Sequence, residues 1–291
     1  MKISVIIVTY NRPILCNKLL QSLEKQSVKP SEVIVIDDHS IKPFHPIKKY
    51  CFSLILIRNK KERGLAASRN IGIKRAKGDI LAFIDDDALP FKDWLYSIKK
   101  SIIDHEIDIV GGPCIAIYMT DPPFWWDPKI LGKYLAVAND FIVGCNFAVK
   151  KEVFREIGFF NEKLGRYAGS KISGEETEFI LRAYMRGYKI LFTSDVRVRH
   201  IILPQRLTLA YLIKRAWNQG LSTYFLTKGN IVYVFKEKEM NRKIRRKNEE
   251  SPNNAGLRTL PTRCIAYILL LISLAAFIYA SFKCYKKKDA T

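Results

Sequence analysis

Three consecutive aspartates, Asp85, Asp86 and Asp87, follow the apolar run 80–84, which is typical of a buried strand. Carboxylates this close repel one another strongly in a cleft of low dielectric, so a bound cation would explain them. Oxygen ligands favour Mg²⁺ or Mn²⁺. The remaining coordination positions of such an ion would be filled by waters and by phosphate oxygens of a substrate. The alternative is a solvated turn, or the N-terminal cap of the helix expected near Phe91.

Asp37 and Asp38 follow a second apolar run, 33–36. A carboxylate at this position could accept a hydrogen bond from the N–H of a nucleotide base, and the alternative is an Asx turn. Thr9 and Tyr10 follow the first apolar run of the chain in the same way. Ligands of parallel sheets bind at the carboxyl ends of the strands, so we expect these polar groups to gather at one edge.

Three glutamates open a helix expected between Gly174 and Gly187. The helix dipole favours acidic residues in a first turn whatever the function, and Glu178 can pair with Arg182 at i, i+4. Glu176 instead shares a largely apolar helical face, so it is the candidate general base.

His200 ends the alternating sequence Val-Arg-Val-Arg-His. Its side chain shares a strand face with Val196 and Val198, while the two arginines point the other way. An inward histidine of this kind is either a satisfied core residue or a metal ligand.

The elements that must position these residues alternate between strand and helix patterns. Strands are predicted at 3–8, 33–36, 54–57 and 80–84, and helices from 11–13, over 65–77 and near 91–103. Continuous apolar strands separated by helices predict an α/β fold with a mainly parallel sheet and helices on both faces.

The composition is that of a globular chain with a strongly basic end. The 48% hydrophobic content excludes a disordered chain, and the net charge of +21 is concentrated in residues 197–291, which hold 19 Lys and Arg against 5 Asp and Glu. Such a charge suits either nucleic-acid phosphates or an anionic membrane surface.

A run of 19 uncharged residues, 264–282, favours the membrane. As a helix it would extend about 28 Å, close to the hydrocarbon thickness of a bilayer. We therefore predict a single membrane helix, with a buried core helix as the alternative. More Lys and Arg precede it than follow it, which places the main domain in the cytoplasm.

Five segments follow from these patterns. We expect residues 1–107 and 108–205 to form two halves of one α/β domain, 206–235 an amphipathic helical extension, 236–263 a basic linker and 264–282 the transmembrane anchor.

Seven motifs together resemble family 2 of the inverting glycosyltransferases, whose fold is called GT-A. In order they are VIIVTYNRP (5–13), VIDDHS (35–40), GLAASRNIG (64–72), GDILAFIDDD (78–87), GCNFAV (144–149), GFFNE (158–162) and GEETE (174–178). Their consistent order over residues 3–200 is far more specific than any single motif.

The resemblance implies a donor, a metal and a base, with residues 1–107 as the nucleotide-sugar-binding half and 108–205 as the acceptor and catalytic half. The donor would be a nucleotide-diphosphate sugar, bound by Thr9, Tyr10, Arg12, Asp37, Asp38, Arg69 and Asp86. Mg²⁺ or Mn²⁺ would be held by Asp85, Asp87 and His200. The base would be Glu176, with Glu175 as a substitute, because the family more often has Asp after the first glutamate.

Three other functions compete with this one. A sugar nucleotidyltransferase would carry a Gly-rich loop after its first strand, and residues 9–13 contain no glycine. The cluster 242–247 (RKIRRK) could bind nucleic acid, but its place beside the apolar run fits anionic lipid, so we expect no nucleic-acid partner. A processive polymerase would carry Gln-x-x-Arg-Trp and several membrane helices. We therefore expect transfer of one sugar to a lipid-linked or surface-glycan acceptor.

Overall fold

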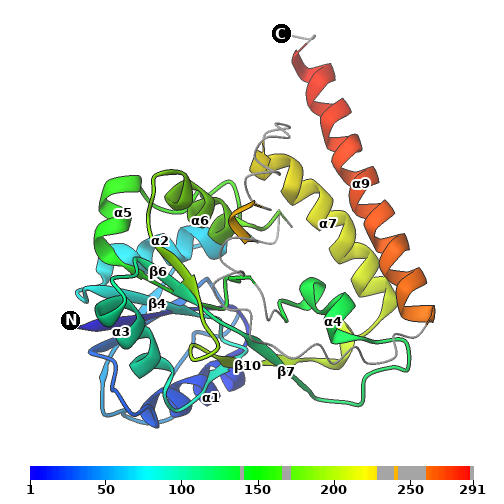
Figure 1. The fold of residues 1–291 in the computed structure, drawn as a ribbon. Helices are drawn as coiled ribbons and strands as arrows, with labels where there is room; N and C mark the ends of the chain where they lie inside the picture. The colour runs from blue at the N-terminus through cyan, green and yellow to red at the C-terminus, as the bar shows by residue number, and fades with distance from the viewer. Residues whose placement is uncertain (138–140, 166–171, 228–238, 242–259, 289–291) are drawn as a thin grey trace.

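A seven-stranded sheet forms the centre of the computed structural model, which describes residues 1–137, 141–165, 172–227, 239–241 and 260–288 (Figure 1). The strand order is β3-β2-β1-β4-β8-β6-β9. The strands are β1 (Ile3–Thr9), β2 (Glu32–Asp37), β3 (Ser53–Arg58), β4 (Ile80–Ile84), β6 (Ile109–Gly111), β8 (Asn146–Lys150) and β9 (Ile190–Phe192).

The sheet is mainly parallel, as predicted. β1 pairs in parallel with β2 and β4, and β2 pairs in parallel with β3, whereas β8 runs antiparallel to its neighbours β4 and β6. All residues of β2 and β4 are buried, which explains their continuous apolar sequences. The parallel strands all end at the same edge, so the residues that follow β1, β2 and β4 lie close together.

Helices cover both faces of the sheet. Side chains of α1 (Pro13–Glu24) and α3 (Trp94–Asp104) pack on one face, in a core that includes Val5 and Ile7 of β1. Side chains of α2 (Leu65–Arg75), α5 (Lys151–Ile157) and α6 (Glu175–Met185) pack on the other face, together with Ile6. The alternation along β1 therefore supplies both cores.

A second, three-stranded sheet brings the histidine to the aspartates. It consists of β5 (Ala88–Pro90), β10 (Val198–Ile202) and β7 (Cys114–Tyr118), and its register places His200 opposite Ala88, the residue after Asp87. Because residues 88–90 pair with β10, α3 begins at Trp94 and not near Phe91 as predicted.

Two long helices lie side by side at the C-terminal end (Figure 1). α7 (Leu209–Thr227) packs along α9 (Leu260–Lys288), and the hydroxyl of Ser273 donates to the carbonyl of Ala216 at 2.7 Å. The short helices α4 (Pro128–Leu131) and η1 (Gly132–Leu135) share a core with this pair.

Within the part of the chain that the structure describes, one helix is long and apolar enough to cross a membrane, over Thr262–Ser281. The predicted run 264–282 lies inside α9, which begins four residues earlier. Most of the predicted linker, 236–263, lies outside the described residues.

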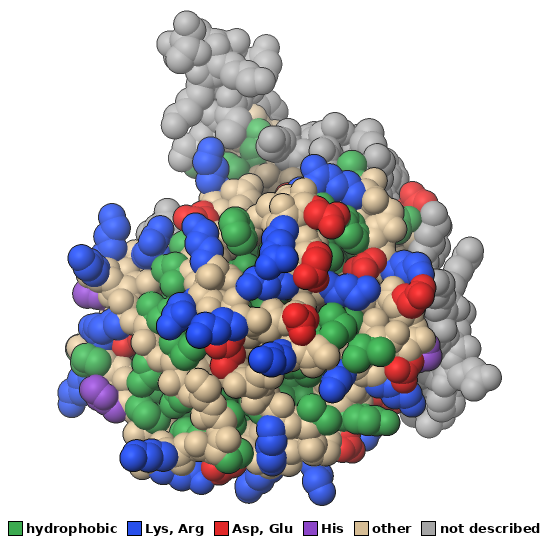
Figure 2. Space-filling model, turned by 90° about the vertical axis from the view of Figure 1, so that its left-hand side faces the viewer, with side chains coloured by type: hydrophobic (Ala, Val, Ile, Leu, Met, Phe, Trp, Pro, Cys, Tyr) green, Lys and Arg blue, Asp and Glu red, His purple; other side chains and the backbone are tan. Residues whose placement is uncertain are grey.

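The face of the molecule turned away from this helix pair carries many charged side chains, with hydrophobic side chains between them (Figure 2). Figure 2 shows Lys and Arg side chains spread across it, with Asp and Glu between them. The exposed surface of α9 is instead mainly apolar. Its large exposed apolar residues include Tyr267, Ile268, Leu270, Leu271 and Leu274.

Candidate active site

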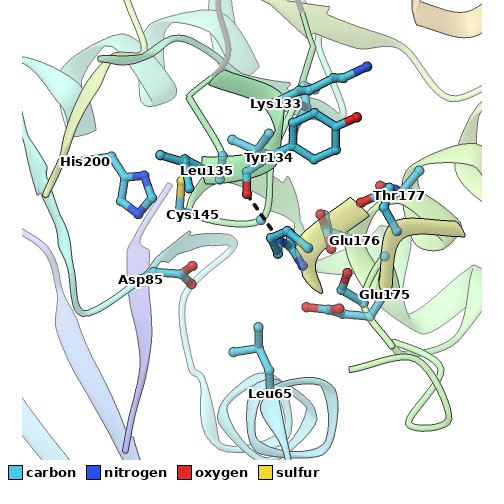
Figure 3. Close-up of a pocket in the computed structure, with 18 of the residues that line it drawn as sticks. Leu65, Asp85, Lys133, Tyr134, Leu135, Cys145, Glu175, Glu176, Thr177 and His200 are labelled. Atoms are coloured by element: carbon cyan, nitrogen blue, oxygen red, sulfur yellow. Dashed lines mark hydrogen bonds between the residues drawn. The ribbon is translucent and has the colours of Figure 1, made fainter. Parts of the chain in front are cut away.

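A pocket of about 690 Å³ joins the carboxyl ends of β1, β2 and β4 to the start of α6 and to β10 (Figure 3). Ten of the twelve residues predicted for the site line it: Tyr10, Arg12, Asp38, Arg69, Asp85, Asp86, Asp87, Glu175, Glu176 and His200. Thr9 and Asp37 lie behind the residues that line it. The strand ends thus bring together side chains that are up to 190 positions apart in the sequence.

Arg69 is a buried cation that connects two of the predicted carboxylates. Its guanidinium donates to Asp85 at 2.8 Å, to Glu175 at 2.7 Å and to the carbonyl of Gly144 at 2.6 Å. Burial alone would lower the pKa of Arg69, but the negative charges of Asp85 and Glu175 outweigh it and raise the pKa. Arg69 therefore links the end of β4 to the first turn of α6.

The two candidate bases have different surroundings. Glu175 is buried, with 2% of its surface exposed, and its carboxylate is paired with Arg69. Glu176 is half-buried and lines the pocket, which Asp85 also faces with a carboxylate that is 34% exposed (Figure 3). A Cβ at Gly144 would lie 3.3 Å from the Cδ of Glu176, so a glycine at 144 leaves this carboxyl its space.

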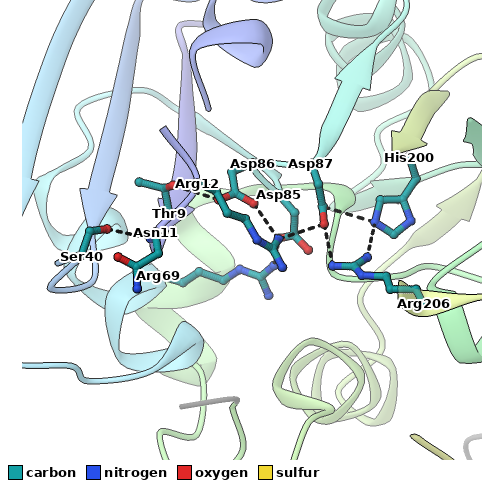
Figure 4. A network of polar contacts seen from close by, with 10 residues as sticks. All are labelled: Thr9, Asn11, Arg12, Ser40, Arg69, Asp85, Asp86, Asp87, His200 and Arg206. Atoms are coloured by element: carbon teal, nitrogen blue, oxygen red, sulfur yellow. Dashed lines mark hydrogen bonds and ion pairs between the residues drawn. The ribbon is translucent and has the colours of Figure 1, made fainter. Parts of the chain in front are cut away.

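Asp86 points back into the protein. Its carboxylate accepts hydrogen bonds from the hydroxyl of Thr9 at 2.8 Å and from Arg12 at 3.1 Å (Figure 4). Burial raises the pKa of Asp86 to about 7 against the opposing effect of the Arg12 charge. Thr9 does not line the pocket, and its connection to the site is this hydrogen bond to Asp86.

Asp87 has three cationic or hydrogen-bonding partners. Its carboxylate lies 3.0 Å from Arg12, 2.9 Å from Arg206 and 3.2 Å from Nε2 of His200 (Figure 4). Burial would raise the pKa of Asp87, but the hydrogen bond from His200 and the charges of Arg206 and Arg12 hold it well below the ordinary value. These contacts therefore favour the ionised form of Asp87.

The fold agrees with the comparisons with known proteins. Residues 4–158 match the family model described as glycosyl transferase family 2. The chain belongs to this family.

Three similar proteins illustrate the range of the family. The glucosyl-dolichyl phosphate glucuronosyltransferase of Haloferax volcanii is 26% identical over 240 residues, which cover 76% of each chain. The uncharacterized glycosyltransferase YwdF of Bacillus subtilis is 41% identical over 204 residues, which cover 69% of this chain and 71% of YwdF. The mannosyltransferase PcManGT from Pyrobaculum calidifontis was solved in complex with GDP-Man and Mn²⁺. Its structure matches with a TM-score of 0.62 at 20% identity, and the match covers 97% of this chain and 87% of that chain. This likeness shows the GT-A fold.

A divalent cation in this family 2 glycosyltransferase would depend on its substrate for ligands. The described residues contain no group of three or more His, Cys, Asp or Glu arranged to hold a metal ion. Asp87 and His200 nevertheless form a close pair beside the partly exposed Asp85, and Nδ1 of His200 is buried without a hydrogen-bond partner. The Asp87–His200 pair could supply part of the coordination of Mg²⁺ or Mn²⁺, which keep waters and take phosphate oxygens in their remaining positions.

The two aspartates after β2 are held by the loops around them. Asp37 accepts from the backbone N–H groups of Ser40 at 2.8 Å and Phe44 at 3.0 Å, and from Arg58 at 2.8 Å. An Asx turn was the alternative for Asp37; its carboxylate instead accepts from the N–H three residues on and supports the loop.

Asp38 lines the pocket, where its carboxylate accepts from the backbone N–H groups of Arg63 and Gly64. Asp38 therefore shapes the pocket wall that precedes α2. A contact with the nucleoside base remains a prediction for this residue.

Sequence reasoning missed Arg206, which lies in the 3-10 turn Pro204–Arg206 and donates to Asp87. The available signal was an arginine six positions after a candidate histidine, at the end of a predicted strand. That signal is weak, because the contact depends on how β10 pairs with β5.

Proposed function

We propose that this glycosyltransferase moves one sugar from a nucleotide-diphosphate sugar to a hydroxyl of a lipid-linked or surface-glycan acceptor, with inversion at the anomeric carbon. The observation that supports this most directly is that Asp85 and Glu176 line one pocket while Glu175 is buried against Arg69. One carboxylate is thus placed for donor binding, and a second is placed for proton transfer.

The donor would occupy the strand-end part of the pocket. Tyr10 and Asp38 line the part next to β1 and β2, where the nucleoside would bind. Arg12 and Arg206 lie beside Asp87, so their charges face the place where the diphosphate would lie. Mg²⁺ or Mn²⁺, held by Asp85, Asp87 and His200, would stabilise the charge on the leaving diphosphate.

Glu176 would act on the acceptor. Its carboxylate takes the proton of the acceptor hydroxyl, and the oxygen attacks the anomeric carbon from the face opposite the diphosphate. The bond between that carbon and the phosphate oxygen breaks, and the nucleoside diphosphate leaves. Glu175 is the weaker candidate, because its ion pair with Arg69 would have to break first.

Membrane attachment would place the enzyme beside its acceptor. The apolar exposed face of α9 supports attachment, and the Haloferax relative's name points to a dolichyl phosphate-linked sugar as that protein's substrate. We propose that α9 is the single membrane segment and that the catalytic domain lies in the cytoplasm, on the basis of the flanking charges.

A donor panel tests this proposal. Purified full-length protein is incubated with UDP-, GDP- and dTDP-sugars and with Mn²⁺ or Mg²⁺, and nucleoside diphosphate release is measured with and without chelator. We expect release from one nucleotide class, dependent on the metal. Absence of binding and release with every donor in every metal condition would refute the proposal.

A further inference from the structure

The pocket does not end at Glu176. It continues to η1 and to the helix pair, where its lining includes Lys133 and Tyr134 of η1, Arg215 of α7, and Leu270 and Ser273 of α9. The nucleotide part of the site does not need this extension, which lies at the opposite end from Tyr10 and Asp38.

Two cations lie at the helix end of the pocket. The Nε of Arg215 donates to the carbonyl of Tyr134 at 3.1 Å, and this hydrogen bond holds the guanidinium beside η1. The Nζ of Lys133 lies 5.2 Å from the centre of the Tyr134 ring, and no carboxylate of the described residues lies within 4.0 Å of it. Lys133 and Arg215 thus bring two positively charged side chains to the same end of the pocket.

An apolar surface begins where these cations lie. Leu270 lines the pocket and is 55% exposed, and the next turn of α9 exposes Leu274. Across the helix pair, Trp217 of α7 lies 5.8 Å from Tyr279 of α9 between ring centres. A ligand that fits this end of the pocket therefore needs an anionic group next to a long apolar group.

We propose that this extension binds the acceptor, and that the acceptor is a lipid phosphate or diphosphate with a polyprenyl-like chain. Its phosphate lies between Lys133 and Arg215, and its chain leaves the pocket past Leu270 along the surface of α7 and α9. This inference rests on the proposed function and deepens it, because it selects an anionic lipid over a soluble glycan as the acceptor carrier. A free phosphate lacks the apolar part, and a neutral lipid lacks the charge.

Binding of a short probe tests the inference with the full chain in neutral detergent. Calorimetry compares farnesyl diphosphate with farnesol and with inorganic pyrophosphate. We expect farnesyl diphosphate to bind at least about tenfold more tightly than either, because only it has both features. Equal binding of farnesol, or equal binding of pyrophosphate, would overturn the inference.

Matched variants identify the residues responsible. Arg215→Ala and Lys133→Ala are each expected to weaken farnesyl diphosphate binding about tenfold, whereas Lys214→Ala, on the exposed side of α7, leaves it unchanged. Leu270→Trp fills the groove and weakens binding, while Leu271→Trp, which lies outside the pocket, does not. These tryptophan variants preserve the test if an arginine variant fails to fold.

Nucleotide binding separates this inference from the proposed function. UDP and GDP affinities should not change in any of these variants. If Arg215→Ala weakens nucleotide binding instead, the cation serves the donor and the lipid site is refuted. If nucleotide sugars bind but farnesyl diphosphate binds no more tightly than farnesol or pyrophosphate, only the lipid site is refuted. If farnesyl diphosphate binds through Arg215 but no nucleotide sugar binds, only the transferase proposal is refuted.

Discussion

The guanidinium of Arg69 bridges Asp85 and Glu175 with contacts of 2.8 and 2.7 Å, and so joins the end of β4 to the first turn of α6. Glu175 is 106 positions away from Arg69 in the sequence. Both glutamates line the pocket, but Glu175 is buried in its ion pair with Arg69, whereas Glu176 is half-buried.

Replacing Arg69 tests this structural role. Arg69→Met removes a buried cation and breaks its ion pairs with Asp85 and Glu175, so the free energy of unfolding should fall by about 3–5 kcal/mol. Urea unfolding measures the change. Arg155→Met, which removes an exposed arginine of α5, is the control and should change the free energy by less than about 0.5 kcal/mol. Equal effects of the two substitutions would contradict the role of Arg69.

The acid dependence of stability should change when Asp37 is replaced. Burial raises the pKa of Asp37, but hydrogen bonds from Ser40 and Phe44 and the charge of Arg58 lower it overall. The ionised Asp37 carboxylate therefore stabilises the fold above the pKa of about 4 that it has in the unfolded chain. This stabilisation is lost as the pH falls through the lower pKa of Asp37 in the folded protein. Asp37→Asn should be about 1–3 kcal/mol less stable than the wild type at pH 7, with the difference shrinking below pH 4. A difference in the free energy of unfolding between Asp37→Asn and the wild type that stays constant from pH 7 to pH 3 would exclude this explanation.

The packing of α7 on α9 depends on Gly220. A Cβ at this position would lie 2.0 Å from the backbone oxygen of Ser273 and 2.8 Å from the Cβ of Ala276. Gly220→Val should therefore separate the helices and lower the melting temperature by several degrees. Ala210→Val places the same side chain on the exposed side of α7 and should have a much smaller effect, although helix propensity disfavours Ala→Val and favours Gly→Val. Similar melting temperatures for both variants would show that the helices do not pack closely.

The sequence predicts the sheet and the strand-end residues because both depend on local patterns. Apolar runs mark β1, β2 and β4, and the polar residues after them necessarily meet at one edge. The register of β10 on β5, which brings Arg206 to Asp87, depends on a pairing across about 110 residues that no local pattern records. The helical face of Glu176 is enough to prefer it over Glu175 as the candidate base, but the ion pair of Glu175 with Arg69 spans 106 positions and leaves no local pattern.

Metal removal should stop donor turnover. Asp87 and His200 are the closest pair of predicted ligands, so His200→Ala should raise the Mn²⁺ concentration that gives half-maximal nucleoside diphosphate release by about 10–100-fold. His105→Ala, which removes an exposed histidine after α3, is the control. Turnover that is unaffected by chelator would refute the metal prediction.

The most direct test of the account compares Glu176→Gln with the wild type in two measurements on the same samples: donor binding by calorimetry, and sugar transfer to the acceptor. Gln keeps the size of the side chain but cannot take the acceptor proton. The account predicts unchanged donor affinity with transfer reduced at least about 100-fold. Transfer at the wild-type rate, or loss of donor binding, would contradict it.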